Sequence, residues 1–261
     1  MLSVLLPNKV KHFARSTELK SKTDQLDARL LCRFGLERVL PAWQPPTPAL
    51  LQLRGLARER QVLTRQGAQL KTRAHAYAHS YQPDSRTLAR LAAQQQLFTH
   101  QLKALDQDLA DLLTAEPELA RKLAHLISIP GIGLTTAIVV VAETNGFVLV
   151  ENERQLTCYA GLDVVRRQSG LSALATRILR RGNVRLRTAL YLPAVSSLRY
   201  NPQQMAFYAR LRARQPSGKP GVIAVMHKLL ELCYSLWKND CAYDPHYHPA
   251  HLAEMEVAPT T

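Results

Sequence analysis

Two aspartates near the start of the chain, Asp24 and Asp27, have the residue type and spacing of a metal-binding pair. On a helix, a separation of three residues places both carboxylates on one face. Mg²⁺ prefers carboxylate oxygens and the oxygens of substrate phosphates, so the pair could hold this ion. Aspartate at a helix start is also a common capping residue. The pair therefore indicates either a helix cap or part of a Mg²⁺ site.

A serine in an arginine-rich stretch is the candidate nucleophile. Ser169 precedes Gly170, and no acidic residue occurs from Val164 to Leu230, whereas 13 Lys and Arg do. A serine hydroxyl can attack a phosphodiester, and neighbouring cations can neutralise the phosphate. Ser-Gly pairs also mark turns, so both interpretations stay open. The candidate nucleic-acid contacts in this stretch are Arg166, Arg167, Arg177, Arg180, Arg181, Asn183, Arg185 and Arg187.

A glycine-rich turn precedes the serine stretch. The segment Ile129-Pro-Gly-Ile-Gly133, followed by Thr136-Ala137 and an apolar run, is typical of a helix-hairpin-helix. Its glycines allow a tight turn, and the amides at the start of the next helix can hold a phosphate. The alternative is an ordinary turn between core helices. The candidate contacts here are Pro130, Gly131, Ile132, Gly133 and Thr136.

These residues need elements to position them. Ser3–Leu6 could form a buried strand, after which Asn8 could cap a short helix. A second helix is expected from Thr23 to about Phe34, with Gly35 as its end. Leucines at helical spacing predict two long amphipathic helices, over 49–81 and 85–114, joined by a proline turn. Such a pair serves either core packing or oligomerisation as a coiled coil.

Composition limits the classes of protein. The 261 residues contain 34 Lys+Arg and 20 Asp+Glu, a formal net charge of +14, which favours a nucleic-acid partner. The four cysteines form no C-x-x-C pair, which argues against a zinc ribbon and a disulfide framework. No apolar run reaches the roughly 20 residues of a membrane span, so we expect no membrane association and a cytoplasmic location.

Taken together and in order, these motifs resemble the insertion-sequence "one-ten" transposase family, which is grouped with the Transposase_20 and DEDD-type proteins. The resemblance covers residues 1 to about 240. It is carried by Asn8 with Val10-Lys and Phe13, Lys22-Thr-Asp-x-x-Asp-Ala28, Ile129-Pro-Gly-Ile-Gly133 with Thr136-Ala137, Tyr159-Ala-Gly-Leu162, Gln168-Ser-Gly170, Arg181-Gly-Asn183 and Arg185-Leu-Arg187.

The resemblance implies a site-specific DNA recombinase with a RuvC-like metal domain, a coiled coil and a serine-bearing transposase domain. Asp24 and Asp27 would be the third and fourth acids of a Mg²⁺ site, and Ser169 would form a covalent phosphoserine link to DNA. The hairpin at Pro130 to Gly133 would hold nucleic-acid backbone. Some family members are directed by a noncoding bridge RNA, so a guide RNA and a homo-oligomer of two or four subunits are further expected partners.

The first two acids of the family's metal site have no counterpart before Lys22, so the chain looks like an N-terminally truncated member with impaired activity. We therefore expect a mainly α fold. Its expected parts are a RuvC-like α/β remnant (1–40), a proline-rich linker (41–48), a helical hairpin or coiled coil (49–115), a helical transposase domain with the helix-hairpin-helix (116–240) and a loose tail (241–261). The rival hypotheses are a non-catalytic nucleic-acid-binding remnant and a structure-specific nuclease.

Overall fold

The computed structural model describes residues 2–5, 7–17, 23–40, 42–165, 168–169, 172–173, 177–178, 182–214 and 217–246, with the backbone alone over 164–178. The chain is mainly α-helical, as the sequence predicts. It divides into two compact units, Met1–Thr47 and Pro48–Thr261. The finer division into five segments stays a prediction.

The first unit contains two helices, α1 (Pro7–Ser16) and α2 (Asp24–Glu37). Thr23 caps α2, because its side-chain oxygen accepts a hydrogen bond from the Leu26 amide at 3.2 Å. The two helices meet through a small core of Phe13, Leu30 and Phe34. The rings of Phe13 and Phe34 pack edge to face with centroids 4.9 Å apart.

Three local predictions for this unit are wrong. Residues 2–5 form no strand and Val4 is 64% exposed, since no strand among the described residues of the unit can pair with them. Asn8 lies inside α1, which begins at Pro7, a residue whose fixed φ suits the first helical position. Gly35 lies inside α2, which continues to Glu37.

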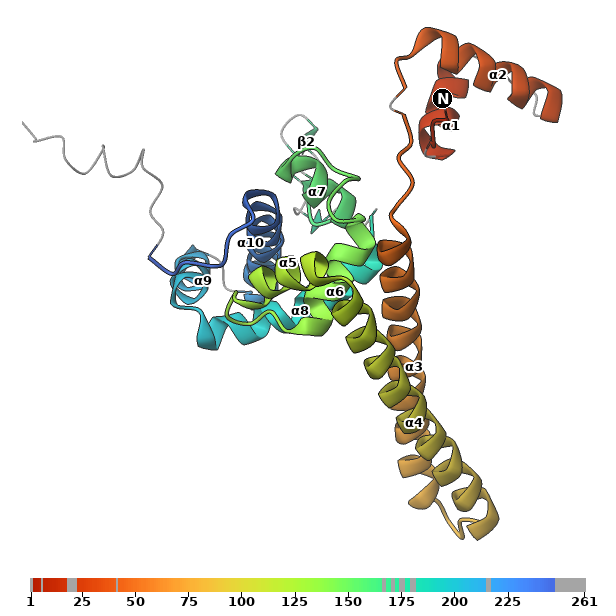
Figure 1. The fold of residues 1–261 in the computed structure, drawn as a ribbon, viewed down its shortest axis with the longest axis vertical. Helices are drawn as coiled ribbons and strands as arrows, with labels where there is room; N and C mark the ends of the chain where they lie inside the picture. Colours follow the sequence, from red (N-terminus) through yellow and green to blue (C-terminus); the bar gives the residue numbers. More distant parts are fainter. Residues whose placement is uncertain are drawn as a thin grey trace, which may run out of the picture. The chain divides into compact units, whose positions relative to one another are not determined.

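The second unit begins with a long helical hairpin (Figure 1), formed by α3 (Pro48–Ala78) and α4 (Ser85–Ala115). The predicted pair of long helices is thereby confirmed. Asp84 caps α4, since its carboxylate accepts hydrogen bonds from the amides of Arg86 and Thr87. The buried residues of these two helices are mostly leucines, namely Leu53, Leu70, Leu91, Leu105, Leu109 and Leu112.

The remaining helices form a core around α6 (Leu134–Thr144), whose residues from Ala137 onward are all buried. It contacts α3, α5 (Pro117–Ile127) and α8 (Val184–Tyr200). The helix α10 (Gly218–Asn239) packs against α5, α8, α7 (Glu153–Ala160) and α9 (Pro202–Arg214). Of the helices in the described part of the chain, none is long and apolar enough to cross a membrane.

Four two-residue strands lie between α7 and α8. The outer pair joins β1 (Val164–Val165) to β4 (Arg177–Ile178), and the inner pair joins β2 (Gln168–Ser169) to β3 (Ser172–Ala173). Both pairs are antiparallel. The sequence predicts a helical domain here, so this extended segment is a departure within an otherwise α-helical unit.

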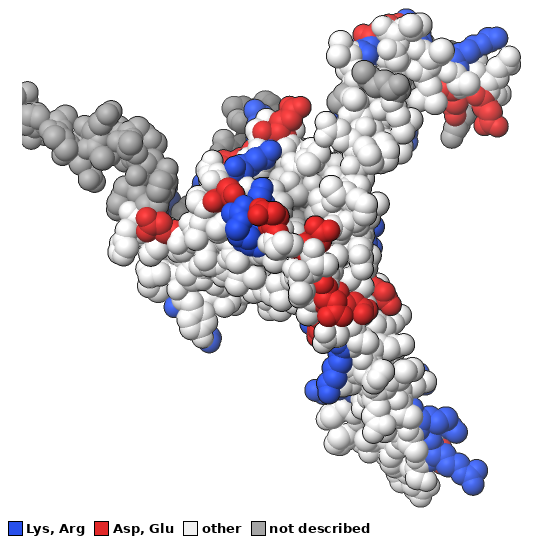
Figure 2. Space-filling view, viewed as in Figure 1, with Lys and Arg blue, Asp and Glu red and all other residues white. Residues whose placement is uncertain are grey.

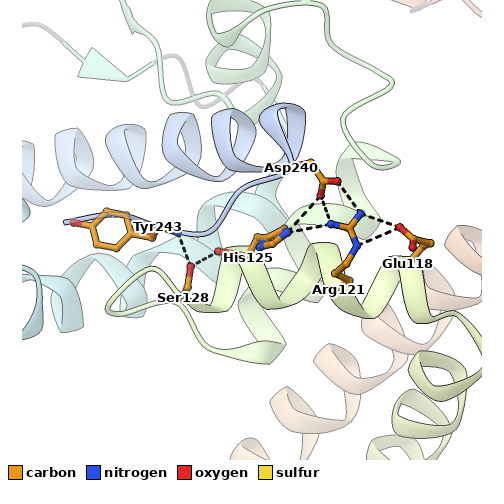
Figure 3. A network of polar contacts seen from close by, with 6 residues as sticks. All are labelled: Glu118, Arg121, His125, Ser128, Asp240 and Tyr243. Carbon is orange, nitrogen blue, oxygen red and sulfur yellow. Dashed lines mark hydrogen bonds and ion pairs between the residues drawn. The ribbon is translucent and has the colours of Figure 1, made fainter. Parts of the chain in front are cut away.

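The segment after α10 is tied to α5 (Figure 3). Arg121 donates to both carboxylate oxygens of Asp240, at 2.8 and 2.7 Å, and these hydrogen bonds hold the pKa of Asp240 below its ordinary value. The Tyr243 amide donates to the Ser128 hydroxyl at 2.8 Å, and that hydroxyl donates to the His125 carbonyl. The described part of the predicted tail is therefore held against the residues that precede the glycine turn.

Candidate functional site

The candidate metal ligands lie on the first turn of α2. Asp24 is exposed and Asp27 is half-buried, and both are within one turn of the Thr23 cap. Carboxylates in this position also complement the positive end of the helix dipole. The described residues contain no group of three or more His, Cys, Asp or Glu side chains that could hold a metal ion. The pair fits the one or two carboxylates that Mg²⁺ commonly takes from a protein beside substrate phosphate, but not a complete set of four acids.

The candidate nucleophile lies on a short β arm of the second unit. Ser169 is in β2 and pairs with Ser172 of β3. In the sequence, β2 and β3 lie between β1 and β4, so Ser169 is in the middle of the segment that joins α7 to α8. The candidate contact Arg177 begins β4, whereas Arg166, Arg167, Arg180 and Arg181 lie outside the described residues.

The two ends of this arm are joined by close contacts. The backbone amide of Asn183 donates to the Tyr159 carbonyl at 2.8 Å, and the Arg187 guanidinium donates to the Ala160 carbonyl at 2.7 Å. A Cβ on Gly182 would lie 2.5 Å from the Gly161 nitrogen, so the backbones meet here with no room for a side chain. The start of α8 is therefore packed directly on the end of α7.

A buried carboxylate stabilises the same junction. Glu143, near the end of α6, is 3% exposed and accepts two hydrogen bonds from Arg58 of α3, at 2.7 and 2.9 Å. Asn183 donates to it at 2.8 Å, and Arg185 lies 3.8 Å away. The Tyr159 hydroxyl donates to the Glu143 backbone carbonyl at 2.9 Å. Glu143 thus connects the helical hairpin to both ends of the arm.

The charge of Glu143 is maintained by these partners. Burial by itself would raise the pKa of Glu143, but the hydrogen bonds from Arg58 and Asn183 outweigh that effect, and the pKa lies below its ordinary value. The same ion pair raises the pKa of Arg58. The carboxylate is therefore ionised at neutral pH, and it serves as a fixed anchor for the two cationic groups nearby.

Three of the predicted nucleic-acid contacts near the start of α8 have partners inside the protein. The Asn183 side chain uses its oxygen to cap α8, accepting from the backbone amides of Arg185 and Leu186, and its nitrogen to bind Glu143. Arg187 is half-buried and binds the Ala160 carbonyl. Arg185 is exposed and lies within ion-pair distance of Glu143, at 3.8 Å. Their contact with nucleic acid stays a prediction, and the structure gives Asn183 and Arg187 a clear role in packing.

The glycine turn joins α5 to α6. Gly131 has φ +104°, and a Cβ there would lie 2.9 Å from the Ser197 Cβ of α8, so only glycine fits. Ile132 is buried, whereas Pro130 and Thr136 are half-buried. Gly133 is exposed and begins α6 with no side-chain cap, so the first amides of the helix have no side-chain acceptor. This geometry is compatible with a phosphate-binding turn.

A groove of about 870 Å³ runs between α3, α6 and α8. Thr135 and Thr136 line it near the start of α6, and Arg185 lines it near the start of α8. Because Gly131 lies beside Ser197 and Glu143 beside Asn183, α6 and α8 run antiparallel. The groove therefore connects the glycine turn with the base of the arm. Asp24 and Asp27, by contrast, belong to the other unit.

Sequence reasoning did not identify Glu143 as a residue of this site. Glu143 follows the apolar run Ile138 to Ala142 as a lone acid, and nothing nearby in the sequence indicates its partner Arg58, 85 residues earlier. A charged residue inside an otherwise apolar helix is the one available signal, since such a residue requires a buried partner.

Two family models of transposases match this chain, in the regions that hold the motifs. The family model described as "Transposase IS116/IS110/IS902 family" matches residues 123–209, which include the glycine turn and the arm. A second transposase model, of the DEDD type of the IS110 group, matches residues 2–83, which include Asp24 and Asp27.

Similar proteins come from several bacteria. The pilin gene-inverting proteins of Moraxella lacunata and Moraxella bovis are 31% and 30% identical over 256 residues, which cover 95% of this chain and 76% of each relative. A putative transposase of Sinorhizobium fredii is 28% identical, over 84% of this chain and 66% of the relative. The chain therefore belongs to the IS116/IS110/IS902 family of transposases.

Proposed function

We propose that this chain is a DNA strand-exchange enzyme that forms a transient covalent link between Ser169 and DNA. The observation that carries the proposal is the β arm: Ser169 lies in the middle of a segment with paired strands, whose base is fixed by Asn183, Arg187 and Gly182. A fixed base would hold a nucleophile in position to attack a phosphodiester. The pilin gene-inverting relatives support a reaction that rearranges DNA at specific sites.

The proposed reaction conserves the energy of the phosphodiester bond. The Ser169 oxygen attacks phosphorus, a new O–P bond forms, and the bond to the deoxyribose oxygen breaks. The serine proton is released and the leaving oxygen takes up a proton. A deoxyribose hydroxyl from another DNA end then attacks the phosphoserine, which restores the serine and completes the exchange. No nucleotide cofactor is consumed.

The proposed DNA contacts lie along the groove. The uncapped start of α6 would receive a phosphate oxygen on its backbone amides, and the exposed Arg185 would neutralise a second phosphate near the arm. The arginines of this stretch, from Arg166 to Arg181, would neutralise the charge of the reacting phosphate. Asp24 and Asp27 would hold Mg²⁺, which when bound neutralises negative charge on phosphate. The proposal also includes two partners of the chain, namely a guide RNA and further copies of the chain in a homo-oligomer.

The test is a search for the covalent adduct. Labelled DNA fragments that span the chain's own gene and its flanks are incubated with the protein, with and without RNA transcribed from the same fragments. Denaturing electrophoresis and mass spectrometry then detect DNA joined to serine. We expect an adduct at Ser169 that Ser169→Ala abolishes, while DNA affinity stays within a few-fold. Dependence of the adduct on the RNA would support the guide.

Ser172 provides a matched control, because it lies opposite Ser169 on the same hairpin. Ser172→Ala should retain the adduct. An adduct that persists in Ser169→Ala, or that is lost only in Ser172→Ala, would refute the assignment. DNA binding by the wild type with no adduct under any of these conditions would favour the non-catalytic binding protein.

A further inference from the structure

The far end of the helical hairpin carries an unusual concentration of positive charge. Between residues 65 and 103 the only carboxylate is Asp84, and the cations are Arg65, Lys71, Arg73, Arg86, Arg90 and Lys103. The near end of the hairpin, residues 48–64 and 104–115, has four carboxylates and three cations. Figure 2 shows this contrast: blue side chains mark the tip of the hairpin, and red ones gather nearer the core.

The two ends of the hairpin also differ in how they use their charges. Near the core, Arg60 of α3 pairs with Asp106 of α4 at 2.6 Å, so the helices neutralise each other. At the tip, Lys71, Arg73 and Arg86 are exposed and form no ion pair within the described chain. Arg90 lies 3.9 Å from Asp84, whose carboxylate already caps α4. The tip therefore keeps a net positive charge.

This concentration of positive charge destabilises the hairpin, and helix formation does not compensate for that loss of stability. Arg86 and Arg90 are separated by four residues, a spacing at which like charges destabilise a helix. A hairpin with no binding partner would be expected to alternate acidic and basic side chains, as the near end does. Tyr81, which is 91% exposed at the turn, adds an aromatic ring beside these cations. Exposed cations around an aromatic residue are typical of nucleic-acid contact surfaces.

We propose that the tip of the α3–α4 hairpin binds the phosphate backbone of duplex DNA that flanks the recombination site. The surface comprises Lys71, Arg73, Arg86 and Arg90 with Tyr81. The inference rests on the proposed action on DNA and adds to it a second contact at a distance. From Ala68, where the groove ends on α3, to Ala78 at the end of that helix is 10 residues, or about 15 Å at 1.5 Å per residue. That distance corresponds to roughly 4 base pairs at 3.4 Å each, so one duplex can lie on both surfaces.

The salt dependence of binding provides the test. A 40-base-pair duplex can reach both the tip and the groove. On this duplex, the tip variant Lys71→Gln/Arg73→Gln/Arg86→Gln/Arg90→Gln should show a shallower slope of log affinity against log salt than the wild type. Each phosphate contact that is lost reduces the slope by about 0.9, so the full effect is up to about 3.6.

Fluorescence anisotropy between about 50 and 200 mM salt measures these slopes. The matched control is Arg73→Lys/Arg86→Lys/Arg90→Lys, which retains the charge and should retain the slope. All substituted side chains are exposed, so circular dichroism and thermal unfolding should show intact helices. Binding whose salt slope depends on the tip cations, in a protein that forms no Ser169 adduct, would refute the proposed function and leave this surface supported.

Other outcomes overturn the inference. A tip variant whose slope on the 40-base-pair duplex equals that of the wild type has no DNA contact at the tip. If the variant instead loses binding to the transcribed RNA alone, the surface belongs to RNA. If sedimentation shows that a wild-type oligomer dissociates in the variant while its slopes are unchanged, the tip meets another copy of the chain.

Discussion

Replacing Glu143 by glutamine tests whether this carboxylate holds the core of the second unit together. The carboxylate receives three hydrogen bonds, from Arg58 at 2.7 and 2.9 Å and from Asn183 at 2.8 Å, while its side chain is only 3% exposed. Glutamine has nearly the same volume, but it has no charge and presents an amide donor toward a guanidinium. Glu143→Gln therefore removes the ion pair without creating a cavity.

The expected loss can be bounded from the geometry. Removing one partner of a fully buried ion pair costs about 3–5 kcal/mol. Here Arg58 is 43% exposed, so its guanidinium can be hydrated after the change, and we expect about 3 kcal/mol, the lower end of that range. For a domain of this size, each kcal/mol lowers Tm by about 2–4 °C, so Tm should fall by roughly 6–12 °C.

The dependence on pH distinguishes a charge effect from a packing effect. The pKa of Glu143 is lowered in the folded chain, so its contribution to stability is present above the ordinary glutamate pKa of about 4.3. That contribution is lost as the pH falls through the lowered pKa of the folded state. The difference in Tm between the wild type and Glu143→Gln should be constant from about pH 7 to 5.5 and should shrink below about pH 4.3.

Thermal unfolding followed by circular dichroism measures this difference. Glu118→Gln is the control, because Glu118 also pairs with an arginine but its side chain is 79% exposed, and we expect little change in Tm. A Glu143→Gln protein that unfolds at the wild-type temperature, or a difference in Tm that does not vary with pH, would refute the reasoning.

Three glycine substitutions extend the test to the turn and to the base of the arm. Gly131→Ala should destabilise the second unit by about 2 kcal/mol or more, because φ is +104° and the Cβ would meet α8. Gly133→Ala is the control: its Cβ would lie in open space, so the change should cost less than about 1 kcal/mol. Equal Tm values for the two variants would contradict the turn geometry. Gly182→Ala should lower Tm and reduce the yield of the Ser169 adduct, since its Cβ would lie 2.6 Å from the Tyr159 carbonyl oxygen, and a wild-type yield would mean that this junction does not position the arm.

The long hairpin shows how far local sequence can predict this structure. Leucines at helical spacing and the break at Pro83-Asp84 predict α3 and α4 within a few residues of their observed ends, because each long helix must bury one continuous apolar stripe. The structure of the first unit was harder to predict from the sequence. Ser3–Leu6 has the composition of a strand, but a strand needs a neighbouring strand to which it can form a ladder of hydrogen bonds, and the described part of the unit contains no strand.

The sequence by itself determined the family, the order of the motifs and the types of residue available for chemistry. Motifs such as Gln168-Ser-Gly170 and Arg181-Gly-Asn183 are local, so they can be identified without a fold. Only the tertiary structure decided that Asn183 caps α8 and binds Glu143, and that Glu143 is the buried carboxylate of this junction. The partners of Glu143 come from α3 and α8, 85 and 40 residues away, and their meeting depends on how the helices pack. The buried carboxylate is stable because those distant cationic and amide groups meet it there.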